Sequence, residues 1–157
     1  MIGLKKTQKA ASQLSGKIHR TPLFSSRILG EQIGCELFLK CECFQKTGSF
    51  KPRGALNKVL SLTPAEKAKG LITVSAGNHA QAVAWAAQQV NAPCAVVMPT
   101  AAPKSKIAAV RDYSAEVILH PDRATLFDKL NEEKDVSGAT FIPVSYTHLT
   151  LPTSFLV

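Results

Sequence analysis

Hydrophobic residues follow two patterns along this chain, and from residue 71 onward the two patterns alternate. Four short apolar runs, spaced 23, 22 and 24 residues apart, begin at Leu71, Cys94, Glu116 and Thr140. Between them, apolar side chains recur at helical spacing over residues 78–89, 103–112 and 123–135. Strands and helices that alternate at this distance predict an α/β fold: an open parallel sheet with right-handed crossovers and helices on both faces.

The first 70 residues lack this regular period. Residues 4–15 predict a short polar helix, and residues 21–29 lead from an extended Thr-Pro into a helix or turn. Residues 35–44 alternate well enough to predict a strand. A helical spacing follows over residues 52–62, and Pro, Lys and Gly over residues 63–70 predict a turn that ends it.

Composition narrows the class of protein. The chain has 157 residues with 45% hydrophobic content, enough for one domain with a core. The net charge is +8, but the basic residues are interspersed with acids and aromatics are only 6%, so we expect no nucleic-acid partner. No apolar run approaches the roughly 20 residues of a membrane helix, and the N-terminus does not read as a secretory signal.

The four cysteines lie in apolar or strand-like segments. Cys41 and Cys43 alternate, which would place them on one face of a strand, and no His or second Cys pair completes a zinc pattern. We therefore expect reduced, mostly buried thiols in a cytosolic (cytoplasmic) protein, and no metal ligands.

Two segments carry the candidate chemistry. In "QKTGSFKPRGA", Lys51 stands between Phe50 and Pro52, and a lysine held in a dry site can do covalent chemistry. Pro52 suits the first position of a helix. "SAGNHAQ" follows an apolar strand and opens a helix, where Gly77 allows a ligand close to the backbone and free N–H groups bind anions. Helix capping explains one polar residue there, but not four beside a glycine.

These two segments resemble the pyridoxal-phosphate enzymes of the tryptophan-synthase-β fold type, and they are most similar to the threonine/serine dehydratases and to serine racemase. The resemblance runs from about Thr21 to Ile142 and includes "TPLFSS", "LFLKCE", "VVMPTAAPKSKIAAVR" and "AEVILHP". It implies that Lys51 binds the cofactor pyridoxal 5'-phosphate covalently and later acts as a base. It also implies that Phe50 packs on the cofactor ring and that Asn78 binds the ring hydroxyl. The predicted substrate-carboxylate loop is Ser75, Ala76, Gly77, Asn78 and His79.

The resemblance also implies a domain organisation. Residues 1–51 match the start of a large domain, and residues 52–142 match the small α/β domain. The family's glycine-rich phosphate loop lies downstream of anything in this chain, so the large domain is expected to be truncated. Ser114 stands where such enzymes usually have Gly, and a positive φ there would strain it.

The C-terminal stretch differs from the rest in composition. Residues 143–157 contain no acid, Lys or Arg, and Val144–Thr153 resembles the translation of a transposase adapter used in sequencing libraries. We therefore expect residues 143–157 to be a non-native tail, although the same residues also favour β structure.

The resemblance implies a lyase that converts L-threonine, and L-serine, to a 2-oxo acid and ammonia. The full-length parent would act on a small amino acid as a homo-oligomer, without a membrane partner, and the truncated chain would be inactive. The alternatives are an amino-acid racemase of the same fold and a non-catalytic α/β module that binds a small molecule. Serine racemases have a hydroxyl residue where this chain has Ala76, and a methyl group cannot deliver a proton, which favours the lyase.

Overall fold

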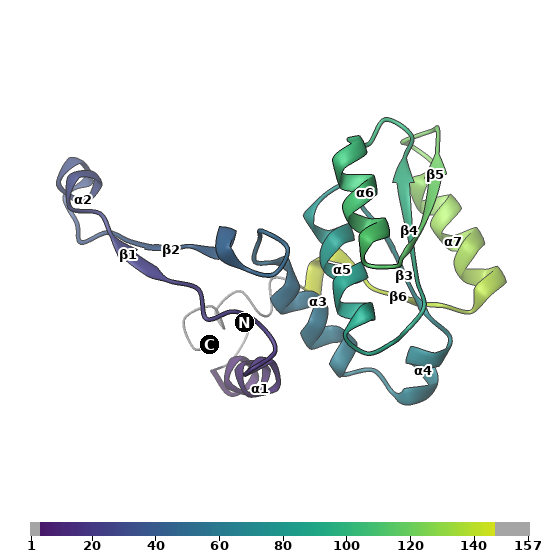
Figure 1. Cartoon of the computed structure of the whole chain (residues 1–157), viewed down its shortest axis with the longest axis horizontal. Helices are drawn as coiled ribbons and strands as arrows, with labels where there is room; N and C mark the ends of the chain where they lie inside the picture. The colour runs from purple at the N-terminus through teal and green to yellow at the C-terminus, as the bar shows by residue number, and fades with distance from the viewer. Residues whose placement is uncertain (1–3, 147–157) are drawn as a thin grey trace.

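The computed structural model describes residues 4–146 of the chain. Figure 1 shows a body built around one sheet and an arm that extends away from it. The arm carries β1, α2 and β2, and the body carries the second sheet with its helices. Within residues 4–146, no helix is both long and apolar enough to cross a membrane.

The body contains the parallel sheet that the hydrophobic period predicts. Its strands lie in the order β5-β4-β3-β6, and all three pairings are parallel. The predicted α/β class is thereby confirmed. Their bounds are close to the predicted runs: β3 is Leu71–Val74, β4 is Cys94–Pro99, β5 is Glu116–His120 and β6 is Thr140–Phe141.

Helices cover both faces of this sheet. α5 (Asn78–Gln88) and α6 (Lys104–Asp112) pack on the face formed by alternate residues of β4, including Val96 and Met98. α7 (Leu126–Ser137) packs on the opposite face, where its Leu130 contacts Val97. The central strands β3 and β4 are therefore covered on both sides, which is why they read as nearly continuous apolar runs, whereas the edge strand β5 leaves Glu116 and Leu119 exposed.

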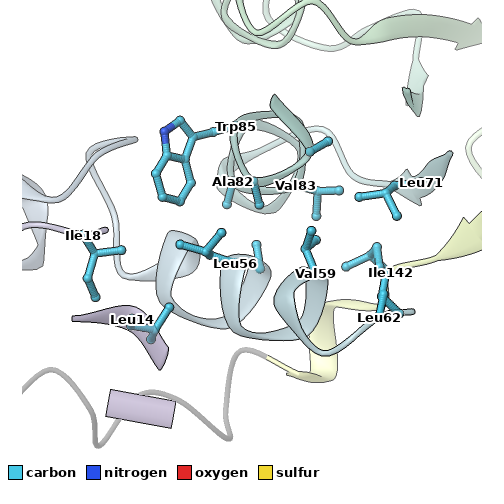
Figure 2. Close-up of a cluster of buried hydrophobic side chains, with 13 residues drawn as sticks. Leu14, Ile18, Leu56, Val59, Leu62, Leu71, Ala82, Val83, Trp85 and Ile142 are labelled. Atoms are coloured by element: carbon cyan, nitrogen blue, oxygen red, sulfur yellow. The ribbon is translucent and has the colours of Figure 1, made fainter. Parts of the chain in front are cut away.

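A second helical layer covers α5. α3 (Lys51–Leu60) packs along α5, and α1 (Leu4–Leu14) packs on α3. Figure 2 shows the resulting cluster, in which Leu56 and Val59 of α3 lie against Ala82 and Val83 of α5. Further members of this cluster are Leu14, Ile18, Leu62, Leu71, Trp85 and Ile142. Burial of this apolar surface fixes α3, and with it Lys51, relative to the sheet.

The arm is a two-stranded antiparallel ribbon of β1 (Leu23–Ser25) and β2 (Phe38–Lys40), with α2 (Arg27–Ile33) at its tip. Many of its large hydrophobic side chains are exposed: Leu23, Phe24, Ile28, Leu29, Ile33, Phe38, Leu39 and Phe44. Apolar patches of this kind are typical of surfaces that contact another molecule or another part of a protein.

Three predictions in the first 70 residues need correction. The strand predicted over residues 35–44 is limited to β2, followed by a 3-10 turn, η1 (Glu42–Phe44). Cys35 and Cys43 are exposed and Cys41 and Cys94 are half-buried, so the cysteines are not mostly buried. The predicted turn over residues 63–70 contains a short helix, α4 (Pro64–Ala68), which begins with a capping box between Thr63 and Glu66.

The chain leaves the sheet through Ile142, which is buried, and then forms a 3-10 turn, η2 (Val144–Tyr146). The expected non-native tail covers residues 143–157, and its residues 147–157 lie outside the part of the chain that the structure describes. Ser114 has a φ of +62°, so it occupies the left-handed region, as the sequence led us to consider for this residue.

Candidate active site

The two segments singled out in the sequence meet at one edge of the sheet. From β3 the chain crosses through α5 to β4 on one side, whereas β6 lies on the other side of β3. Open α/β sheets bind ligands at such a switch point, beyond the carboxyl ends of the strands. Ser75–Gly77 follow β3 at this point and lead into α5, and α3, which begins at Lys51, packs along α5. The Lys51 charge also lowers the pKa of His79, the second residue of α5. The predicted lysine and the predicted loop therefore belong to neighbouring elements of the fold.

Lys51 is the first residue of α3, and Pro52 lies in the first turn of that helix as expected. The Lys51 Nζ atom lies 4.8 Å from the centroid of the Phe50 ring. Burial of the amine lowers the pKa of Lys51 below its ordinary value. A lower pKa increases the fraction of neutral amine, which is the form that attacks a carbonyl or accepts a proton.

The loop after β3 leaves backbone donors available. Ser75 Oγ accepts a hydrogen bond from Gly77 N at 3.2 Å, which closes the loop on itself. Gly77 is the N-cap residue of α5, and within the described chain it receives no side-chain cap bond. A Cβ added at Gly77 would meet no atom within 4 Å. The first N–H groups of α5 thus lie beside open space, which suits a carboxylate or another anion.

Asn78 begins α5 and is exposed. Its Oδ1 atom accepts a hydrogen bond from Lys106 Nζ of α6 at 2.9 Å. This contact joins α5 and α6 through two residues that are 28 positions apart in the chain.

His79 differs from the expected side-chain donor of the loop. It is 3% exposed, and its Nε2 atom lies 3.0 Å from the Ile142 carbonyl oxygen. Because a carbonyl only accepts, Nε2 carries the proton, and Thr73 Oγ1 donates to the same oxygen at 2.8 Å. Burial lowers the pKa of His79, the Lys51 charge lowers it further, and the hydrogen bond to Ile142 acts against both. The neutral imidazole of His79 therefore links the start of α5 to the residue that follows β6. The Nδ1 atom and the backbone N–H of His79 are the groups that could contact a ligand.

A polar network braces the segment that leads into Lys51. Arg53 is fully buried, and it donates from Nε and Nη2 to the two carboxylate oxygens of Glu42, each at 2.8 Å. Thr21 Oγ1 donates to Glu42 Oε1 at 2.6 Å. Gln45 exchanges two hydrogen bonds with the backbone of His19, at 2.9 and 2.8 Å. The start of α3 is thereby fixed to both chain segments that precede it.

Sequence reasoning missed these supporting residues: Lys106, Thr73, Arg53 and Glu42. The contacts of Lys106 and Thr73 depend on which helix and strand lie side by side, and no short spacing in the chain indicates that. Arg53 carried a usable signal, because it lies within the helix predicted over residues 52–62, two positions after Lys51.

Two cavities lie at different distances from the loop that follows β3. One of about 210 Å³ opens beside the loop and is lined by Val74, Ser75, Ala76, Pro99, Arg123, Leu126 and Phe127. A larger one, of about 490 Å³, lies on the arm between α2 and β2, away from α3, and its lining contains no residue of the predicted site. Among residues 4–146, no three His, Cys, Asp or Glu side chains gather in a way that could hold a metal ion.

A parallel sheet with a lysine and an anion-binding loop at its switch point defines an α/β ligand-binding domain. A family profile described as pyridoxal-phosphate dependent enzyme matches residues 14–150. The chain belongs to this family.

The chain is similar to members of this family over most of its own length. It is 48% identical over 136 residues to the catabolic L-threonine dehydratase of Escherichia coli, covering 86% of this chain and 41% of that protein. It is 44% identical over 146 residues to the L-threonine ammonia-lyase of Thermotoga maritima, covering 90% of this chain and 36% of that protein. The structure of maize serine racemase superimposes with a TM-score of 0.89 at 35% identity, covering 98% of this chain and 48% of that one.

The chain spans about two fifths of the length of the curated relatives that it matches. The polar groups at its site fit the family's cofactor. Lys51 supplies an amine of lowered pKa beside an aromatic ring. Three buried polar atoms near these segments have no hydrogen-bond partner within residues 4–146: Thr47 Oγ1, Ser49 Oγ and His79 Nδ1. Buried polar atoms of this kind are normally satisfied by protein, water or ligand, so they can accept further partners.

Proposed function

We propose that the full-length protein is a pyridoxal-phosphate lyase that converts L-threonine, and L-serine, to a 2-oxo acid and ammonia. The single observation that supports this most is the packing of α3, which begins at Lys51, along α5, which follows the loop at the carboxyl end of β3. A module that merely binds a small molecule has no need of a partly buried lysine with a lowered pKa at this point. The names of the dehydratase and ammonia-lyase relatives agree with the proposal.

Residues of this chain would bind the cofactor and the substrate and would move the proton. Lys51 would hold the cofactor aldehyde covalently and, once displaced by the substrate amine, take the proton from the substrate α-carbon. Its lowered pKa favours the neutral amine that this step requires. The N–H groups at the start of α5 would bind the substrate carboxylate, and Phe50 would shield one face of the ring from water. The cofactor supplies a cationic conjugated ring that accepts the electron pair of the α-carbon.

Ala76 supports elimination over racemisation. A racemase needs a proton donor or acceptor on each face of the α-carbon, and Lys51 serves one face. Ala76 lines the cavity beside the loop, and its methyl group cannot transfer a proton. The relatives of solved structure include serine racemases, so an amino-acid racemase is the second candidate.

The test follows both products of the full-length protein on L-threonine and on L-serine. We expect 2-oxo acid and ammonia to form, with D-amino acid well below them. Lys51→Ala should abolish the reaction, whereas Lys46→Ala, an exposed lysine in the same segment, should not. Racemisation faster than release of 2-oxo acid would support the second candidate, and no cofactor-dependent turnover of either substrate would contradict both.

The domain organisation remains part of this proposal. Residues 1–51 would begin a large domain, residues 52–142 would form the small domain, and residues 143–157 would be foreign to both. The exposed apolar side chains of the arm support this view, because the rest of a large domain would cover them. We further propose that the full-length protein is a cytoplasmic homo-oligomer. The 157-residue chain should be inactive, and threonine turnover by it at an enzymatic rate, on the order of 10 per second, would refute the division.

A further inference from the structure

The strongest unassigned feature of the site is the contact between α6 and the first residue of α5. Lys106 is half-buried, and its ammonium group donates to Asn78 Oδ1 at 2.9 Å. Asn78 itself is exposed at the edge of the sheet where Lys51 and the loop meet. A hydrogen bond with a charged donor is stronger than a neutral one, so this contact can hold a side chain in one orientation.

The chemistry of the amide makes the orientation consequential. An asparagine side chain has an oxygen that only accepts and a nitrogen that only donates. Lysine can only donate, so Lys106 selects the oxygen of Asn78 and leaves the NH₂ group for another partner. An oxygen on a ligand ring that carries negative charge requires a donor. An inverted amide would present an acceptor to that oxygen and repel it.

We propose that Lys106 is a positioning residue that orients the Asn78 amide so that its NH₂ group faces the cofactor's ring oxygen. This inference rests on the proposed function and deepens it by adding a residue from a third element, α6, to the site. Lys106 acts through Asn78 and does not touch the cofactor. Its charge also polarises the amide, which makes the NH₂ group a better donor to an anionic oxygen.

The chain offers a matched control on the same helix. Lys104 lies two residues before Lys106, begins α6 and is exposed. Residues two apart on a helix point to different sides, so Lys104 does not face Asn78 in the same way. Lys104→Met and Lys106→Met change the net charge equally and differ in the contact with Asn78.

The experiment measures the dissociation constant of pyridoxal 5'-phosphate and the absorption spectrum of its bound form in the full-length protein. Lys106→Met should weaken cofactor binding about fivefold to tenfold, the effect of losing about one net hydrogen bond, and should shift the absorption maximum. Lys104→Met should leave both within about twofold of the wild-type values, since an exposed lysine side chain contributes little. A thermal unfolding midpoint for each variant separates a change in binding from a loss of fold.

A double-mutant cycle with Asn78→Ala makes the test specific. In the Asn78→Ala background, Lys106→Met should have no further effect on binding or on the spectrum. An equal effect of Lys106→Met with and without Asn78, or equal effects of Lys106→Met and Lys104→Met, would overturn the inference. If the wild-type protein carries no cofactor on Lys51, the proposed function fails instead, so the two failures are distinguishable.

Discussion

Replacing Arg53 with methionine tests how the start of α3 is fixed. The Arg53 side chain is 0% exposed and the Glu42 side chain is 13% exposed, and the pair is joined by two hydrogen bonds of 2.8 Å. Methionine fills much of the same space but provides no donor. The substitution therefore leaves the Glu42 carboxylate in a largely buried place with its main partner removed.

The cost follows from the burial of the pair. Removing one partner of a buried ion pair costs about 3–5 kcal/mol because the remaining charge is uncompensated. Thr21 still donates to Glu42 and the Lys40 charge still lowers its pKa, so we expect the lower end, about 3 kcal/mol. Arg27→Met is the matched control. The Arg27–Glu31 pair spans one helical turn with side chains 78% and 62% exposed, so its loss should cost about 0.5 kcal/mol or less.

The free energy of unfolding is measured by urea denaturation of the 157-residue chain. Trp85 is its single tryptophan and is 5% exposed in the core, so its fluorescence reports unfolding directly. Adding Glu42→Gln to Arg53→Met should recover part of the lost stability, because the stranded charge is removed. A loss below about 1 kcal/mol, or a loss equal to that of Arg27→Met, would refute the reasoning.

The same pair predicts a dependence on pH. Burial raises the pKa of Glu42, but the hydrogen bonds from Arg53 and Thr21 and the charges of Arg53 and Lys40 outweigh it, and the net shift is downward. A carboxyl group with a lowered pKa stabilises the fold above its unfolded value, about 4.3, and this stability is lost as the pH falls through the folded value. The stability difference between wild type and Arg53→Met should therefore be full near pH 7 and shrink below about pH 4. A difference that grows on acidification would contradict this assignment.

Two further predictions concern backbone and capping. Ser114→Gly should raise the free energy of unfolding by about 0.5–1 kcal/mol, because a non-glycine residue at a φ of +62° is strained. The control Asn91→Gly, at a φ of +52°, should gain less because asparagine tolerates this region. A loss of stability in Ser114→Gly would show that the serine is favoured there. Thr63→Ala should lower it by about 1 kcal/mol, because the capping box with Glu66 is lost, and an unchanged urea midpoint would mean that α4 contributes nothing to the cooperative unit.

The parallel sheet could be predicted from the chain because its central strands, β3 and β4, are covered on both faces. Burial on both sides produces uninterrupted apolar runs, and β3 begins and ends at the predicted residues. The helix predicted from residue 123 instead begins at Leu126. Asp122 Oδ1 accepts a hydrogen bond from Ala124 N at 2.8 Å, and such a side-chain turn competes with the first turn of a helix.

The arm could be predicted only in part, because its alternation reflects a surface that this chain does not cover. Cys35 and Phe38 look like core residues in the sequence and are exposed in the fold. At the site, the local pattern singled out Lys51 and the loop as candidates, and the roles of these residues, taken from the resemblance to a family, stay predictions. The partners that orient them, such as Lys106, depend on contacts between distant elements, which local spacing does not encode.

The central claim is that Lys51 carries the cofactor, and one measurement tests it directly. The full-length protein is incubated with pyridoxal 5'-phosphate, reduced with borohydride, digested and mapped by mass spectrometry. We predict the pyridoxyl group on Lys51, whose partly buried amine has a lowered pKa. Pyridoxyl label on another lysine, with Lys51 unmodified, would contradict it.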